Sequence, residues 1–385
     1  MRLTPSAYPI RRLNPGDDPA TPFKIFGFPL ARALGDFAAQ NVIMASIKHC
    51  FEHSRLFTFH HDDRPYKSLL IESNWHIDQD FREKDPNLNF PVELFDVQSG
   101  GRVHHADPAF EGQHASWPDL VITPSIMQMQ VLNALPNIAS LHFPDRLVPE
   151  MSDRLVSAGV DPDRWFCVMH YRDVGYEQRP ASALRDSDPE QFLNIRDLLI
   201  DKFGAQVVRV GHPGMTEFPA RAGFVDLIGP SIGFDLQAFA ITRARFLFCG
   251  ASGVGSVGSA FNVPTVIVQS PSEVGTWNHH DMHLCQRFYD PSGKRISIHD
   301  AVRDGVMAEV VFKELIKNHG YSRINNTLDE LREVAGMMVA QTAGVEHWRQ
   351  PEQVPFTEFP NRISLPLTLD MNPFDNHTQF IEFPE

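Results

Sequence analysis

The stretch RFLFCGASGVGSVGSAFNVPTVIVQ, residues 245–269, decides the fold class. Its first apolar run, residues 245–250, predicts a buried strand, and the glycine-rich segment 252–262 predicts a turn that leads into a helix. A second apolar run, residues 264–269, predicts another buried strand. Strand, helix and strand in this order form the repeating unit of a parallel sheet covered by helices.

The same alternation continues on both sides of this stretch. Apolar runs predict strands at 165–172, 205–211 and 224–229, and amphipathic segments predict helices at 189–204, 234–244 and 326–341. The second half of the chain is therefore expected to be a doubly wound α/β domain.

The N-terminal half is less regular. We expect strands at 23–30, 55–61, 67–73 and 119–125, a helix that begins near Asp36, and a loop-rich insertion at 76–118. These patterns divide the chain into an N-terminal α/β domain (1–155), a C-terminal Rossmann-like domain (156–345) and an irregular, proline-rich strap (346–385).

Composition excludes several classes of protein. A net charge of −14 over 385 residues argues against a general nucleic-acid binder. No stretch resembles a signal peptide or a transmembrane span, so we expect a cytoplasmic protein. The four cysteines form no CxxC pair, and no disulfide is expected.

The glycine-rich turn is the first candidate binding site. Small residues after a strand let a ligand phosphate approach the backbone, and the amides and dipole of the following helix stabilise its negative charge. The sequence predicts phosphate contacts at five consecutive positions, namely Ser252, Gly253, Val254, Gly255 and Ser256. The alternative is that the glycines only allow tight packing between helix and strand.

Ionisable residues at the ends of two strands form the second candidate. Arg172 ends the first of these strands, and a guanidinium there can pair with phosphate oxygens in a bidentate geometry. The alternative is an ion pair within the protein. The residues assigned to donor binding with it are His170, Asp173 and Arg179 around that strand, and Arg209 and His212 at the next.

Asp36, in the Gly35–Asp36 pair at the start of the first helix, is the candidate general base. The alternative is an ordinary helix cap. Histidine-rich segments at 60–63 and 279–283 lack an established metal-ligand spacing, and we read them as loop residues or local hydrogen-bonding groups. We therefore assign no metal and no cofactor. The missing GxSxG motif also argues against a serine hydrolase.

Residues 234–269 resemble the donor-binding half of GT-B glycosyltransferases, above all the heptosyltransferase-like group. The segment MHYRDVGYEQRPASALRDSDPEQF, residues 169–192, is similar to a family of bacterial glycosyltransferases, and Ala33–Asp36 is similar to the "GD" helix start of the heptosyltransferase-like group. Ala251 and Val257 depart from the pattern, where an acidic residue and a histidine are usual. The positions that match in order are Leu236, Ala240, Ala244, Phe248, Gly250, Ser252, Gly253, Ala260, Pro264 and Thr265.

This resemblance implies a GT-B-like fold with two Rossmann-like domains that face a central cleft. It implies a metal-independent glycosyltransferase that moves a sugar from a nucleotide-diphosphate donor to a glycan, lipid or protein acceptor, such as a bacterial surface glycan, with peripheral membrane contact left open. Arg172 would neutralise the leaving group, and Asp36 would be the base. Two alternatives stay open: a nucleotide-sugar epimerase or hydrolase on the same fold, and a non-catalytic nucleotide-sugar-binding protein.

Overall fold

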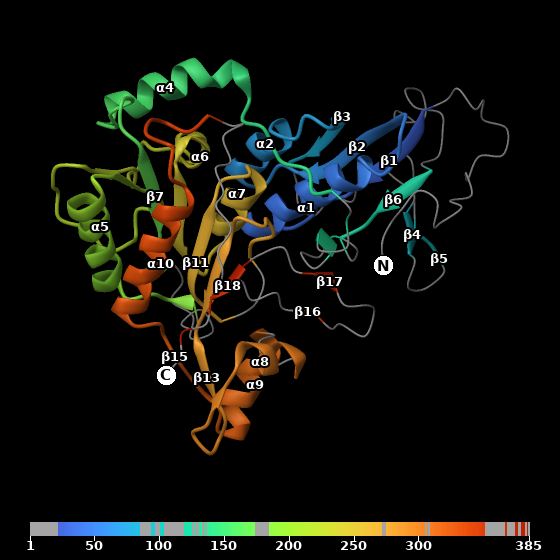
Figure 1. Ribbon diagram of the computed structural model, residues 1–385. Coiled ribbons are helices and arrows are strands. Elements are labelled where there is room, and N and C mark those ends of the chain that lie inside the picture. Colours follow the sequence, from blue (N-terminus) through green and yellow to red (C-terminus); the bar gives the residue numbers. More distant parts are fainter. Residues whose placement is uncertain are drawn as a thin grey trace. The chain divides into compact units, whose positions relative to one another are not determined.

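The computed structural model shows helices around two parallel sheets (Figure 1). The residues it describes are 22–84, 94–96, 101–103, 119–124, 127, 131–132, 135, 137–173, 185–271, 275–304, 306, 309–350, 366–367, 374–375, 379–381 and 383. The chain divides into two compact units, Met1–Leu141 and His142–Glu385. Each unit is described by itself.

Unit 1 is built on a four-stranded parallel sheet in the order β3-β2-β1-β6. Its strands are β1 (Phe23–Gly27), β2 (Ser54–His61), β3 (Ile77–Glu83) and β6 (Leu120–Ile122). A cluster of phenylalanine rings from β1 and β2, with Phe28 just beyond β1, packs on one side of this sheet. The helices are α1 (Leu34–Lys48) and α2 (Pro65–Glu72), and β4 (Leu94–Asp96) pairs with β5 (Gly101–Val103).

The expected strand at 67–73 is wrong, because these residues belong to helix α2. Pro65 stands in its first turn, where proline favours a helix. Lys67, Leu70 and Ile71 are all buried, as the spacing of a helix allows. A short apolar run is compatible with a buried helix as well as with a strand. The hydrophobic period of residues 67–73 alone could therefore not distinguish the two.

Unit 2 contains a seven-stranded sheet in the order β18-β12-β11-β10-β7-β8-β9, and every pairing in it is parallel. The expected doubly wound α/β architecture is therefore confirmed. The strands are β7 (Phe166–His170), β8 (Gln206–Arg209), β9 (Phe224–Asp226), β10 (Phe246–Gly250), β11 (Thr265–Ser270), β12 (Met282–Cys285) and β18 (Gln379–Ile381).

Helices cover both faces of this sheet (Figure 1). On one face, α5 (Pro189–Phe203) and α10 (Leu328–Gln341) share a buried apolar cluster with β7, β8, β10, β11 and β12. On the other lie α6 (Phe234–Arg243) and α7 (Gly253–Ala260). Both sheet faces are apolar because both are covered, which is why these strands read as continuous apolar runs. The 3-10 helix η2 (Asp145–Leu147) leads into α4 (Val148–Ser157).

The interpretation of the histidine-rich segments as solvated loop residues is wrong for His60 and His283, which are fully buried within β2 and β12. Residues 279–280 do form a turn before β12, but His280 in that turn is 1% exposed. The sequence analysis also missed a small antiparallel sheet that follows β12. Its strands β13 (Arg287–Tyr289), β14 (Arg295–Ile296) and β15 (Ser322–Ile324) accompany α8 (Ile298–Arg303) and α9 (Glu309–His319). In the C-terminal segment, β16 (Pro366–Leu367) pairs with β17 (Phe374–Asp375), and β18 extends the large sheet.

The four cysteines are buried free thiols, and Cys167 and Cys249 lie within the apolar strands β7 and β10. Among the described residues, no helix is long and apolar enough to span a bilayer.

Candidate active site

The candidate site lies at one edge of the seven-stranded sheet. Strand β7 lies between β8 and β10, and β11 follows β10, all in parallel. The carboxyl ends of these four strands therefore meet at the same edge, where open α/β sheets bind ligands. The fold brings two groups of predicted residues to this edge. They come from separate stretches of sequence, His170–Arg172 and Ser252–Val254.

The turn between β10 and α7 is shaped by close packing at Gly250. A Cβ added there would lie 2.7 Å from the Ser187 Oγ and 3.7 Å from the Tyr171 Cα, so a larger residue would have to displace the Ser187 side chain. Ser252 caps α7, because its Oγ accepts a hydrogen bond from the Val254 N–H at 3.3 Å. Ser252, Gly253 and Val254 are each partly exposed, so the positive end of the helix dipole is accessible.

The later glycines of this segment serve packing. A Cβ on Gly255 would lie 2.7 Å from the Ile267 Cδ1, and one on Gly258 would lie 2.3 Å from the Thr265 Oγ1. The adjacent Ser256 is buried, and its Oγ donates to the Gly275 carbonyl oxygen at 2.9 Å. The alternative of tight helix–strand packing therefore holds for the buried half of the segment, and the exposed half stays the predicted phosphate site.

His170 is held in one orientation at the end of β7. Its Nδ1 lies 3.0 Å from the Val210 carbonyl oxygen, so Nδ1 carries the proton and Nε2 has its lone pair available. Burial lowers the pKa of His170 to about 4, and the hydrogen bond to Val210 offsets only part of this effect. His170 is therefore neutral near pH 7.

Charged side chains gather next to His170. Burial raises the pKa of Asp186, which the charges of Arg172 and Arg323 oppose, so both guanidinium groups lie near this carboxylate. Burial likewise lowers the pKa of His212, with opposing effects from Asp173 and Arg172. The Asp173 carboxylate accepts a hydrogen bond from the Thr216 N–H at 2.7 Å, which anchors the loop after β8. The structure thus brings together four of the predicted residues, namely His170, Arg172, Asp173 and His212.

Two further residues of this cluster were missed by the sequence analysis. Ser187 is 5% exposed, and neither its Oγ nor the Asp186 Oδ1 has a hydrogen-bond partner among the described residues. Buried polar atoms of this kind are unusual and indicate a ligand or water site. The signal in the sequence was the polar segment RDSD, residues 185–188, directly before the proline that starts α5.

Arg209 has a different environment from Arg172. Its guanidinium forms a bidentate ion pair with Asp226, at 3.1 and 2.5 Å, and donates to the Thr216 carbonyl oxygen at 2.6 Å. It also lies 4.4 Å from the centre of the Phe218 ring. This is the internal ion pair that was the alternative for such residues, so the donor-binding role of Arg209 stays a prediction. Arg179 lies outside the described residues.

Asp36 lies in unit 1, in the first turn of α1, and is exposed. The cap of α1 is Ala33, so the alternative in which Asp36 is an ordinary cap is wrong. The next residue, Phe37, packs under the buried Lys67, whose Nζ lies 5.0 Å from the ring centre and 2.7 Å from the Asp63 Oδ1. Burial raises the pKa of Asp63, but Lys67 outweighs this and lowers it. Among the described residues, no three His, Cys, Asp or Glu side chains form a group that could hold a metal ion.

Comparison with known proteins supports the fold. No protein-family model and no curated protein matches the sequence. A solved glycosyl transferase family 9 protein from Veillonella parvula is 14% identical with a TM-score of 0.50, over 85% of this chain and 99% of that one. The ADP-heptose LPS heptosyltransferase II of E. coli is also 14% identical, with a TM-score of 0.44, over 76% of this chain and 99% of that one.

An E. coli heptosyltransferase solved with ADP is 9% identical, with a TM-score of 0.41, over 74% of this chain and all of that one. Taken together with the two parallel sheets, the match to the Veillonella protein confirms the expected GT-B-like α/β fold.

Proposed function

We propose that this protein is a glycosyltransferase that moves a sugar from a nucleotide-diphosphate donor to a glycan, lipid or protein acceptor. The observation that carries the proposal is the edge of the large sheet in unit 2. There the accessible start of α7 lies on the same side as Arg172, the neutral His170 and the buried hydroxyl of Ser187, which has no hydrogen-bond partner among the described residues. A diphosphate needs amide and guanidinium donors, and a sugar needs neutral polar groups.

In this proposal the donor phosphates lie over the first turn of α7, at Ser252–Val254. The acceptor oxygen forms a bond to the anomeric carbon, and the bond from that carbon to the diphosphate breaks. Arg172 stabilises the charge that develops on the leaving diphosphate, a role for which no metal ion is required. Asp36 takes the proton from the acceptor hydroxyl, and unit 1 supplies the acceptor site.

The proposal also covers further donor-binding residues, the place of action in the cell and the acceptor. We infer that the donor side comprises the C-terminal domain, with Arg179 and His212 as further donor-binding residues, and that the protein acts in the cytoplasm on a bacterial surface glycan. Its support is the confirmed fold together with the motif resemblance in residues 169–192 and 234–269.

The direct test is turnover of nucleotide sugars with and without an added acceptor. Release of the nucleotide that depends on an acceptor, with a glycosylated product, supports a transferase. Consumption of the donor at the same rate without an acceptor would indicate an epimerase or hydrolase instead. Donor binding without any turnover would indicate a binding protein.

A further inference from the structure

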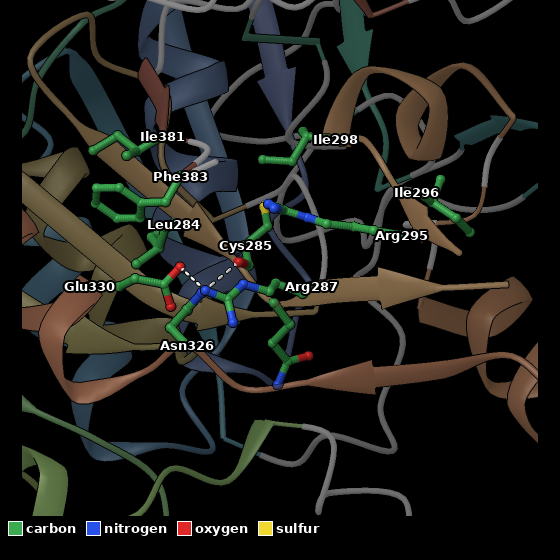
Figure 2. A pocket seen from close by; sticks show the side chains of 11 residues that line it. Leu284, Cys285, Arg287, Arg295, Ile296, Ile298, Asn326, Glu330, Ile381 and Phe383 are labelled. Carbon is green, nitrogen blue, oxygen red and sulfur yellow. Dashed lines mark hydrogen bonds and ion pairs between the residues drawn. The ribbon is translucent and has the colours of Figure 1, made fainter. Parts of the chain in front are cut away.

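A second polar pocket lies on the same edge of the large sheet, at the carboxyl ends of β12 and β18 (Figure 2). Its empty space, counted together with the adjoining open solvent, measures about 260 Å³. Strand β11 separates β12 from β10, so this pocket is distinct from the turn that starts α7. Its walls combine apolar side chains such as Leu284 and Ile298 with two arginines, Arg287 and Arg295.

The small antiparallel sheet places these two arginines on one face. Arg295 on β14 pairs with Tyr289 on β13, and Arg287 precedes Tyr289 by two positions on the same strand. Residues two apart on a strand share a face, so Arg287 and Arg295 are diagonal neighbours with Cα atoms about 7–8 Å apart. Figure 2 shows Arg295 extending toward the end of β12 and Arg287 meeting Glu330. Two guanidinium groups this close can bind one anion together.

Among the described residues of the pocket lining, Glu330 is the carboxylate, and it accepts hydrogen bonds from both a side chain and the backbone. Glu330 accepts a hydrogen bond from the Arg287 Nη2, while its Oε2 accepts from the Thr327 N–H at 2.7 Å as part of the capping box of α10. The Arg287 Nε is buried and has no hydrogen-bond partner among the described residues. A buried guanidinium N–H without an acceptor is costly. In the described part of the chain this N–H therefore lacks an acceptor, which an anion in the pocket would supply.

We propose that this pocket binds a single oxyanion group, a phosphate or a carboxylate, of a small ligand other than the nucleotide. Arg287 and Arg295 bind the anion, the start of α10 adds its positive dipole, and the apolar wall strengthens the interaction by excluding water.

One hydrogen bond and one electrostatic interaction lead from the pocket toward the candidate active site. Gln286, in the pocket lining, accepts a hydrogen bond from the Arg323 Nη1 at 2.5 Å, and Arg323 also lies near Asp186. This inference goes beyond the proposed function and does not depend on it.

The test is a titration of the full-length protein with inorganic phosphate and, separately, with acetate, at constant ionic strength held with chloride. Binding is followed by thermal shift and calorimetry. We expect at least one of the two anions to bind saturably. Saturation by phosphate alone points to a phosphorylated ligand, and saturation by acetate alone points to a carboxylate. Stabilisation that chloride reproduces in full would overturn the proposal.

Variants decide whether the anion binds at this pocket. Arg295→Gln should weaken binding about tenfold or more, because one charged donor is lost. Glu330→Gln keeps the shape, removes the competing negative charge and should strengthen binding. The control is Arg303→Gln, on α8, whose guanidinium pairs with Asp300 and Asp304. Equal affinities in the wild type and in both pocket variants would overturn the proposal. Nucleotide binding in the same variants is measured separately, so failure of one proposal is distinguishable from failure of the other.

Discussion

Arg172 and Arg209 stand at the ends of neighbouring strands, but their surroundings in the fold differ. Arg209 is 1% exposed, and an ion pair, a carbonyl oxygen and an aromatic ring occupy its guanidinium. Arg172 lies instead beside Asp186 and His212 at the edge of the sheet. The sequence pattern of Arg and His at a strand end is the same in both places. Only the fold separates a candidate ligand contact from a structural ion pair.

Replacing Arg172 with alanine should lower donor turnover by about 10²- to 10³-fold, because a charge-stabilising donor is lost from the transition state. The measurement is nucleotide release at saturating donor. Arg164→Ala is the matched control, since that exposed side chain donates to the Gly204 carbonyl oxygen before β7 begins. Near-wild-type turnover in Arg172→Ala would remove this residue from the mechanism.

Replacing Arg209 with alanine should act mainly on stability. The change leaves Asp226 without its bidentate partner and opens space against Phe218. We expect the free energy of unfolding to fall by on the order of 3 kcal/mol, as measured by urea denaturation. Unchanged stability together with a large loss of donor affinity would instead assign Arg209 to the ligand.

At the scale of elements, helix α7 is positioned by the glycines on its buried side. Gly255 and Gly258 face Ile267, Thr265 and Leu247 on β10 and β11, at distances that leave no room for a methyl group. The helix can therefore lie close to the sheet, and its first turn reaches the edge where the strands end. A small displacement of α7 would move the candidate phosphate site with it.

Gly258→Ala should therefore destabilise the protein by about 1–3 kcal/mol, because the added methyl group would lie 2.3 Å from the Thr265 Oγ1 and 2.7 Å from the Leu247 Cδ2. The control is Gly336→Ala in α10, where the nearest atom lies 3.8 Å from the added Cβ. That change should stabilise by about 0.5–1 kcal/mol, through helix propensity. Thermal denaturation of both variants checks the pair, and equal effects would contradict this account of the packing.

The elements that could be predicted from the sequence are those with a long, consistent period. The strands and helices between residues 165 and 270 were predicted within a few residues, because both sheet faces are covered and the runs are continuous. The segment at 67–73 was short, and helix α2 buries the same apolar residues that a strand would. The small sheet β13–β15 was missed because its strands have only two or three residues each.

The candidate site was predicted only where chemistry coincided with a strand end. His170, Arg172 and Ser252 met that condition. Asp186 and Ser187 come from the loop before α5, and nothing in their spacing indicates that they return to β7. A backbone hydrogen bond holds this loop next to β7, because the Ser187 N–H donates to the Arg172 carbonyl oxygen at 2.7 Å. This contact could not be predicted from the sequence.

At the scale of the whole molecule, buried histidines make stability depend on pH. Burial lowers the pKa values of His60, His76 and His170 to about 4, and those of His280 and His283 to about 3. In the unfolded chain these groups take up protons near pH 6.5, whereas the folded chain does not. Stability should therefore fall as the pH falls from about 6.5 toward 4. For His170 alone this corresponds to on the order of 3 kcal/mol.

Asp281 acts in the opposite direction. Burial raises its pKa to about 7, against hydrogen bonds from Ser259 and three backbone N–H groups. Its contribution is lost as the pH rises from about 4 through 7. Because the histidines with lowered pKa values outnumber the aspartates with raised ones, Asp281 and Asp186, acidification should destabilise the protein on balance. Urea denaturation at several pH values between 7.5 and 4.5 measures this, and a flat or rising profile on acidification would contradict it.

The overall charge of −14 does not prevent local binding of anions. Arg172 and the start of α7 at one place, and Arg287 and Arg295 at another, collect positive charge along one edge of the large sheet. A net negative protein can hold a diphosphate there, because amides and guanidinium groups act over short distances while the wider field is screened.

The most direct test of the central claim, that the edge between β7 and α7 binds a nucleotide diphosphate, is a thermal-shift screen with UDP, GDP, dTDP, ADP and CMP compounds. A ligand at 100 times its Kd stabilises the folded state by about 2.7 kcal/mol. We predict that at least one compound raises the Tm, and that Arg172→Ala weakens the effect while Arg164→Ala preserves it. No rise with any compound, or an equal rise in all three proteins, would contradict the account.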